Sequence, residues 1–352
     1  MLLYSQPTSA EEPAPTPFSI AFFYAANPPF KKLKTFDIVV VDPDNAGTSP
    51  KEHQTENNNL FAYVSVGEAD PCRPFFKRVD PVWLIADNSN WGTKVVDLAN
   101  PAWRNFFLEQ IVEPLWAAGY RGFFLDTLDS YQLVKDKGRI PQLTEGLIEV
   151  IREIKRRHPE AKLILNRGFD VLKQIKDVTF AVAAESLFQN FNPATGTYGI
   201  VKEQDRIWLL DHLNAVRKSG LPVIAIDYVD PSERGLARST ANKIKELGFI
   251  PWVTDKGLSS LGDGAIAVQP GDNRGIYFKN QSGQVGLDRI TDRMWHVAEG
   301  FVNKIEVSHK LGMEVGFVAF ILIAIHECLL YGIAGIVTVF KRKEDICSTE
   351  TD

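Results

Sequence analysis

The sequence predicts an α/β fold, a (β/α)8 TIM-type barrel over residues 18–261, with a hydrophobic C-terminal helix after it. Eight short runs of β-branched and aromatic residues alternate with amphipathic stretches between about residues 18 and 258, which is typical of a parallel sheet with crossover helices. Polar residues end most of these runs, where a barrel carries its functional site. An open doubly wound sheet is the alternative, but no GxGxxG or GxxxxGKS/T segment follows the first run.

The predicted strands are nearly continuous apolar runs, which indicates strands covered on both faces. In chain order they are IAFFYA (20–25), FDIVVVD (36–42), FAYVSVGE (61–68), GFFLDT (122–127), LILNRG (163–168), FAVAAES (180–186), VIAIDYV (223–229) and IPWVTD (250–255). VVDLAN (95–100) is a further candidate for a short strand, and it leads straight into a helix.

The best-marked helix begins after Asn100, which can cap it, and Pro101 suits its first turn. Gly119 can end it. Its apolar residues share one face: Trp103, Phe106, Phe107, Ile111 and Leu115. Two similar stripes precede later strands: Leu147, Ile151 and Ile154 before residue 163, and Ala237, Ala241, Ile244 and Leu247, closed by Gly248, before residue 250.

The two ends of the chain differ in composition from the barrel segment. Residues 1–17 join a short apolar run to a Pro/Glu-rich spacer, which fits either a disordered leader or the remnant of a signal peptide. Residues 262–312 form a linker or a truncated domain. Residues 313–352 contain an apolar run of 26 residues, 315–340, and a basic tail.

The apolar run 315–340 is long enough to cross a bilayer as a helix. A central Glu327 costs a few kcal/mol on insertion, whereas each Leu, Ile, Phe or Val contributes about −0.3 to −0.6 kcal/mol, so the aliphatic majority favours insertion. Lys341, Arg342 and Lys343 should then stay cytoplasmic. The barrel would be periplasmic or extracellular, anchored to the inner membrane. A helix buried against the barrel is the alternative.

Charge and metal-ligand residues narrow the classes of function. A formal net charge of −5 gives no general reason to bind nucleic acid and favours a cationic ligand. The three cysteines are far apart and the six histidines stand away from the predicted strand ends, which disfavours a zinc or iron site and a disulfide framework. An all-oxygen magnesium or calcium site stays open. The chain has no GxSxG elbow and no cysteine at a strand end, which disfavours acyl transfer.

Polar side chains at the strand ends form the candidate site. They are Glu68, Asp126, Asn166, Glu185, Asp227 with Tyr228, and Asp255. Because a barrel gathers the C-terminal ends of its strands on one face, we expect them to converge. Any one of them can simply begin a loop. Five carboxylates on one rim, however, repel one another and indicate a use. Two carboxylates are the equipment for hydrolysing a glycosidic bond.

Five strand-end segments, in this order and spacing, resemble glycoside hydrolase family 114, the endo-α-1,4-polygalactosaminidase type. They are VSVGEAD (64–70), GFFLDTLDSY (122–131), LNRGF (165–169), AAESLF (183–188) and AIDYVDP (225–231). The resemblance covers about residues 17–261, not the last quarter of the chain. It implies a barrel enzyme without a cofactor that cleaves a cationic, partly deacetylated galactosamine polymer such as the Pel exopolysaccharide of biofilms. Exopolysaccharide secretion proteins are its expected partners.

The family's catalytic acids are an Asp on the fourth strand and a Glu on the sixth, which match Asp126 and Glu185. The resemblance implies that Asp126 is the nucleophile and Glu185 the general acid/base. Retention of configuration is expected, with inversion as the alternative.

Eight further residues are expected to bind the substrate: Tyr24, Glu68, Asp70, Asp129, Asn166, Arg167, Asp227 and Tyr228. Asp129 and Asp227 would attract protonated amino groups on the sugar. The two tyrosines offer surfaces for sugar rings, with barrel packing as the alternative. The Asn–Arg pair would bond the substrate or position a carboxylate. The two acids that follow VSVG suit a subsite, with loop capping as the alternative.

Two other functions fit the same rim of acids. A binding module would hold the polymer during export or adhesion without cutting it. A metal-dependent barrel enzyme would use the carboxylates as ligands.

Overall fold

The computed structural model describes residues 18–47, 50, 59–262, 266–267 and 277–278. The chain divides into two units, Met1–Gln284 and Val285–Asp352, and the described residues all belong to the first. The predicted leader (1–17) and membrane helix (315–340) lie outside the described residues, as does nearly all of segment 262–312. Among the residues described, none of the helices has the length and apolar character needed to span a membrane.

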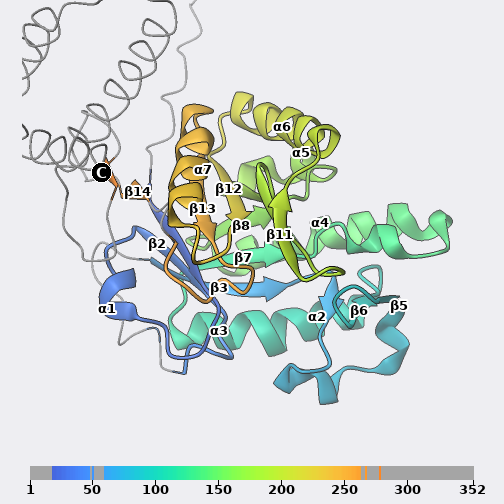
Figure 1. Ribbon diagram of the computed structural model, residues 1–352. Helices are drawn as coiled ribbons and strands as arrows, with labels where there is room; N and C mark the ends of the chain where they lie inside the picture. Colours follow the sequence, from blue (N-terminus) through green and yellow to red (C-terminus); the bar gives the residue numbers. More distant parts are fainter. Residues whose placement is uncertain (1–17, 48–49, 51–58, 263–265, 268–276, 279–352) are drawn as a thin grey trace, which may run out of the picture. The chain divides into compact units, whose positions relative to one another are not determined.

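Eight parallel strands form a nearly closed barrel (Figure 1). Their order is β1 (Ile20–Phe23), β2 (Ile38–Val41), β3 (Asn59–Ser65), β7 (Gly122–Asp126), β8 (Lys162–Asn166), β9 (Ala181–Glu185), β12 (Val223–Tyr228) and β13 (Ile250–Thr254). Each lies within or overlaps one predicted run, so the predicted barrel is confirmed. Their side chains are almost entirely buried, because the barrel interior covers one face and the helices cover the other.

The barrel closes between β1 and β13 through loops and side chains. The Tyr24 N–H donates to the carbonyl oxygen of Leu258 at 2.8 Å. Inside the barrel the rings of Phe22 and Trp252 lie 6.4 Å apart, and Phe22 also meets Phe124 edge-on at 5.1 Å. These aromatic rings fill the barrel below its C-terminal ends.

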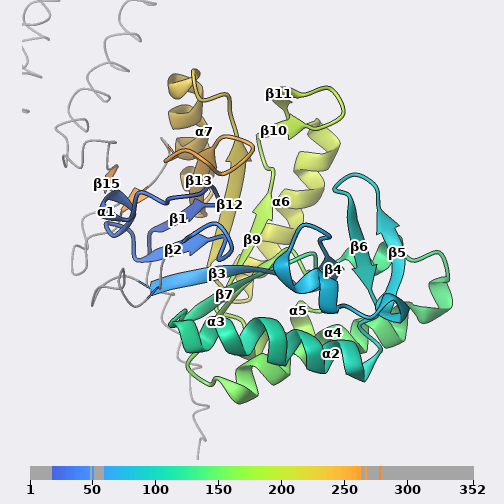
Figure 2. The ribbon, with the colours of Figure 1, turned by 90° about the horizontal axis from the view of Figure 1, so that it is seen from below.

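Helices cover the outer face of the sheet (Figures 1 and 2). They are α1 (Phe30–Leu33), α2 (Pro101–Phe107), α3 (Glu113–Ala118), α4 (Ile140–Arg157), α5 (Leu172–Ile175), α6 (Glu203–Lys218) and α7 (Arg234–Glu246), with a π-helical turn η4 (Leu108–Val112) between α2 and α3. Short 3-10 turns are η2 (Pro74–Arg78), η3 (Pro81–Trp83), η5 (Ser130–Leu133), η6 (Lys137–Arg139) and η7 (Lys176–Val178).

The predicted helix signals act as expected. The Asn100 side chain accepts a hydrogen bond from the Ala102 N–H, and Gly119 ends α3 with a left-handed φ of 113°. The predicted apolar stripes are buried at Leu147, Ile151 and Ile154 on α4, and at Ala237, Ala241 and Ile244 on α7. Leu247, the last residue predicted for the second stripe, follows α7 as its C-cap and is only partly buried. Burial of these stripes holds the helices on the sheet.

Two antiparallel insertions follow the ends of β3 and β9. The first is a three-stranded sheet of β4 (Glu68–Ala69), β5 (Leu84–Asn88) and β6 (Thr93–Val96), and β6 corresponds to the short strand predicted at 95–100. The second is the hairpin of β10 (Gln189–Asn192) and β11 (Thr197–Ile200). A further two-stranded sheet joins β14 (Ile266–Ala267) to β15 (Tyr277–Phe278).

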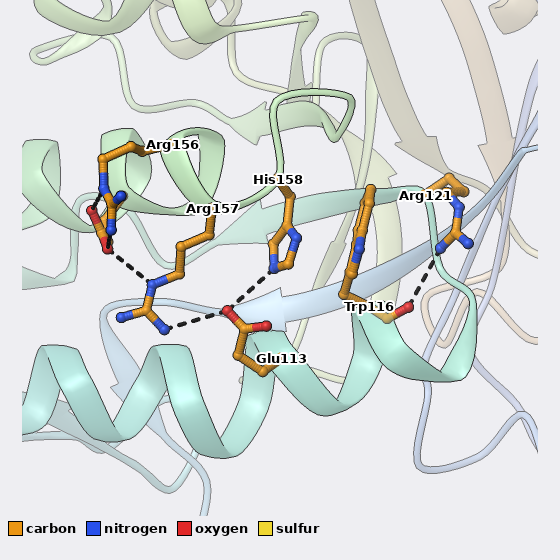
Figure 3. Close-up of polar contacts among 7 residues, drawn as sticks. Glu113, Trp116, Arg121, Arg156, Arg157 and His158 are labelled. Carbon is orange, nitrogen blue, oxygen red and sulfur yellow. Dashed lines mark hydrogen bonds and ion pairs between the residues drawn. The ribbon is translucent and has the colours of Figure 1, made fainter.

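A stack of three side chains locks α3 and α4 together near the N-terminal ends of β7 and β8 (Figure 3). Trp116 stacks on the His158 ring at 4.4 Å, and the Arg121 guanidinium lies 4.7 Å from the Trp116 ring centroid. Glu113 joins the stack through His158 Nε2 at 3.3 Å and also pairs with Arg157. This end of a barrel serves stability, so His158 has a structural role there.

Candidate active site

Three adjacent strands, β7, β8 and β9, deliver the two proposed catalytic acids and an amide between them. Asp126 ends β7, Asn166 ends β8 and Glu185 ends β9. Asn166 Nδ2 donates to Asp126 Oδ1 at 2.8 Å and to Glu185 Oε1 at 3.1 Å. The expected convergence of these side chains, 59 residues apart at the extremes, is therefore seen in the structure.

One amide nitrogen fixes the spacing of the two carboxylates. Its two hydrogen bonds are 2.8 and 3.1 Å long, so Asp126 Oδ1 and Glu185 Oε1 cannot lie more than about 6 Å apart. Retaining glycosidases hold their carboxyl groups about 5–5.5 Å apart, whereas inverting enzymes need about 6.5–9.5 Å for a water. An upper limit of about 6 Å between these two oxygens lies below the range for inverting enzymes.

A tyrosine completes the environment of each acid. The Tyr63 hydroxyl, from β3, donates to Asp126 Oδ2 at 2.7 Å. The Tyr228 hydroxyl, from β12, donates to Glu185 Oε2. The acids and their three donors thus form one hydrogen-bonded row across five strands.

Burial sets the protonation behaviour of this row. Burial raises the pKa of Asp126, while the hydrogen bonds from Tyr63 and Asn166 oppose the rise. Burial also raises the pKa of Glu185, and the nearby charge of Asp126 raises it further. Because the negative charge of one acid favours the proton on the other, the pair suits one ionised and one protonated carboxyl.

The backbone after β7 is held in a tight turn against β3. Thr127 has a φ of 61°, and its hydroxyl accepts from the Gly67 N–H at 2.9 Å and lies 2.9 Å from Ser65 Oγ. A Cβ at Gly67 would lie 2.2 Å from the Thr127 carbonyl oxygen, so only glycine fits there. This close approach fixes the residue that follows Asp126.

Arg167 serves the backbone around Glu185. It has a φ of 60°, and its Nη2 donates to the carbonyl oxygen of Glu185 at 2.6 Å. On its outer side the guanidinium lies 5.9 Å from the ring of Trp208, which is 49% exposed. These contacts fit the expected positioning role more directly than a substrate contact.

Glu68, an expected subsite residue, is buried and fully engaged within the protein. Its Oε1 accepts from Asn88 at 2.9 Å and from the Ser130 hydroxyl, and its Oε2 accepts from the Thr93 hydroxyl. The carboxylate therefore ties the β5–β6 hairpin to the segment after Asp126. In the structure Glu68 therefore holds two segments of the protein together.

Asp227 is likewise fully buried, and its carboxylate holds the loop after β9. It accepts from the main-chain N–H groups of Leu187, Phe188 and Gln189 at 2.6 to 2.8 Å. Burial raises its pKa to about 6, although the three N–H groups oppose that rise.

Asp255 similarly holds the backbone of the loop after β13, at Gly257, Ser259 and Ser260. Three of the five predicted rim acids thus support loops.

The remaining predicted residues differ in exposure. Tyr24 is partly buried, with its ring 5.1 Å from that of Tyr63. Asp129 is exposed at the start of η5. Asp70 is partly exposed and caps its own loop by accepting from the Cys72 N–H at 2.8 Å.

Sequence reasoning missed Tyr63 and the group around it. Arg73 lies over the Tyr63 ring, 5.6 Å from its centroid, and its Nη1 donates to Asp42 at 2.6 Å and to Asp44 at 2.8 Å. The available signal was the alternation of FAYVSVGE, which places Tyr63 and Ser65 on one face of β3, next to β7. Within the described ranges, no group of three or more His, Cys, Asp or Glu side chains could hold a metal ion.

A (β/α)8 barrel with two carboxylates bridged by one amide at its C-terminal face is the construction of a glycoside hydrolase. The protein is an enzyme of this class. It belongs to glycoside hydrolase family GH114, whose family model matches residues 3–274.

The solved structures that resemble the chain include a member of the same class. The glycoside hydrolase domain of PelA from Pseudomonas aeruginosa is 38% identical, over 69% of this chain and 97% of that chain, with a TM-score of 0.63. A variant of that domain matches at 37% identity over the same shares with the same score. Ega3 from Aspergillus fumigatus, in complex with galactosamine, is 17% identical over 72% of this chain and 96% of that one, with a TM-score of 0.49. No curated protein sequence matches the chain.

Proposed function

We propose that the protein hydrolyses α-1,4-linked galactosamine and N-acetylgalactosamine polysaccharide of the Pel type, with Asp126 as nucleophile and Glu185 as general acid/base and with retention of configuration. The observation that carries this proposal is the Asn166 amide, which bonds both carboxylates and so sets a spacing suited to a covalent intermediate.

In the first step the Glu185 carboxyl protonates the glycosidic oxygen while an oxygen of Asp126 attacks the anomeric carbon. The bond from that carbon to the leaving oxygen breaks, and a glycosyl ester forms on Asp126. In the second step Glu185, now ionised, takes a proton from water. The water oxygen attacks the anomeric carbon and releases the carboxylate of Asp126.

Similarity to the PelA hydrolase domain supports the choice of substrate. Family membership supports the same choice. The charge of the chain supports it independently, because a cationic polymer suits a net charge of −5 and an exposed acid, Asp129, just beyond the proposed nucleophile. Tyr24 is a partly exposed aromatic residue near the acids on which a sugar ring would stack. Under this proposal residues 18–261 are the hydrolase domain. The run 315–340 would anchor it outside the cytoplasm, beside the exopolysaccharide secretion proteins.

The test uses the full chain and purified galactosamine-rich polysaccharide. Asp126→Asn and Glu185→Gln should each lower the release of oligosaccharides by about 10³-fold or more, because each removes one half of a two-carboxyl mechanism. Asp177→Asn is the matched control. That acid is exposed, pairs with Arg152, and lies on η7, before the N-terminal end of β9 and so at the opposite end of this strand from Glu185.

The outcomes are separable. NMR of the first-formed reducing end distinguishes retention from inversion. Either variant with most of its activity contradicts the role given to that residue. Binding without any change in the length of the polymer, by the wild-type chain, would point to a binding module.

A further inference from the structure

Tyr63 holds one oxygen of the proposed nucleophile in a fixed direction. Its hydroxyl donates to Asp126 Oδ2 at 2.7 Å, while Asn166 donates to Oδ1 at 2.8 Å. The two donors come from β3 and β8, the strands on either side of β7. A carboxylate held at both oxygens from opposite sides keeps its plane fixed, and attack on an anomeric carbon requires such alignment.

Three neighbours hold the ring of Tyr63. Tyr24 lies against it at 5.1 Å, Phe124 stacks on it at 6.3 Å, and the guanidinium of Arg73 lies 5.6 Å from its centroid. The two aspartates Asp42 and Asp44, both from the loop after β2, hold that guanidinium. Because three neighbours from different parts of the chain contact the ring, its hydroxyl has little freedom to leave Asp126.

We propose that Tyr63 is a positioning residue that aims the Asp126 carboxylate, and that Arg73 holds the Tyr63 ring in place from the rim. This inference rests on the proposed role of Asp126 as nucleophile. It assigns a function to a residue that a strand pattern alone presents as barrel packing.

The protonation of Tyr63 fits a donor role. Burial raises its pKa well above 10, and the charge of Asp126 raises it further, so the hydroxyl keeps its proton at neutral pH. A donor to the ionised form of a carboxyl favours ionisation. Besides Tyr63, the titratable groups that act on Asp126 are Glu68, Glu185, Tyr24 and Tyr228.

Tyr63→Phe isolates the hydroxyl, because the phenyl ring keeps the packing. We expect kcat to fall about 10- to 100-fold with KM within about twofold, because a positioned, charge-assisted hydrogen bond is lost while sugar contacts remain. We also expect the acid limb of the pH profile of kcat/KM to move up by about one pH unit, since the ionised form of Asp126 loses a donor. A residue that only packs would leave that limb in place.

Tyr131→Phe is the matched control. Tyr131 is also buried, and its hydroxyl donates to another aspartate, Asp170, at 3.3 Å. This control should leave kcat and the acid limb unchanged. Arg73→Met, which keeps the stem and removes the charge, should move kcat in the same direction as Tyr63→Phe by a smaller factor.

A second measurement keeps the inference separate from the proposed function. The 13C carboxyl resonance of Asp126, assigned by its loss in Asp126→Asn, should titrate at higher pH in Tyr63→Phe. If Asp126→Asn is inactive but neither the resonance nor the acid limb moves in Tyr63→Phe, the role of Tyr63 is wrong and the proposed function stands. If Asp126→Asn keeps its activity, both fail.

Discussion

Asp227 should make the barrel less stable as the pH rises from about 4 to about 6. Its carboxyl is fully buried, and burial raises its pKa from 3.8 to about 6. Within this window the folded protein keeps a proton that the unfolded chain has lost, so the free energy of unfolding falls as the pH rises. The difference between the two pKa values corresponds to about 3 kcal/mol.

Asp227→Asn removes this titration and leaves the other buried acids in place. Their own pH dependence therefore cancels when the variant is subtracted from the wild-type chain. We expect the free energy of unfolding of the wild type, minus that of the variant, to fall by up to about 3 kcal/mol between pH 4 and pH 7. Urea unfolding followed by tryptophan fluorescence, in steps of half a pH unit, measures both proteins.

The absolute stability of Asp227→Asn serves as an internal check. An amide oxygen cannot replace a carboxylate that accepts three N–H groups, so at least one of Leu187, Phe188 and Gln189 loses its partner. The variant should be less stable even at pH 4, because the hydroxyl oxygen of the protonated carboxyl keeps a lone pair for an N–H group and the NH2 group of asparagine has none. A difference between the two proteins that stays constant with pH, or grows as the pH rises, would refute the reasoning. It would mean that the three N–H groups outweigh burial.

Two substitutions near the acids give further predictions. Tyr228→Phe removes the hydrogen-bond donor to Glu185, so the pKa of Glu185 should rise. The basic limb of the pH profile of kcat/KM, where Glu185 loses its proton, should then move to higher pH. An unmoved limb would count against the contact. Gly67→Ala forces a Cβ against the Thr127 carbonyl oxygen, so the free energy of unfolding in urea should fall by about 1–3 kcal/mol and hydrolytic activity should also fall. Wild-type stability together with wild-type activity would show that the turn can relax.

The barrel could be predicted because its strands are buried on both faces. A run such as FAVAAES is apolar on both faces, which is typical of a strand in a parallel barrel. The eight predicted runs therefore agree with the observed strands to within a few residues. The convergence of Asp126, Asn166 and Glu185 could also be predicted, since it follows from the topology alone. Their roles came from the family resemblance.

The polar contacts inside the site could not be predicted in the same way. Glu68 and Asp227 were predicted to contact the substrate. In the structure their carboxylates accept hydrogen bonds from loop residues far away in the sequence, such as Asn88 and Leu187. Tyr63 was not among the predicted site residues, because whether a strand tyrosine reaches a carboxylate depends on which strand lies next to it. In each case the partner is a residue that only the folded chain brings close.

The closure of the barrel between β1 and β13 has a consequence for folding during synthesis. These neighbours stand at residues 20–23 and 250–254, so nearly the whole domain must be synthesised before the first strand meets its last partner. Pairing across such a separation is slow and costly in chain entropy. Until then β1 presents an open edge to other chains, the kind of surface that invites aggregation. Chaperones are therefore expected to matter most for this enzyme in the interval before its final strand emerges.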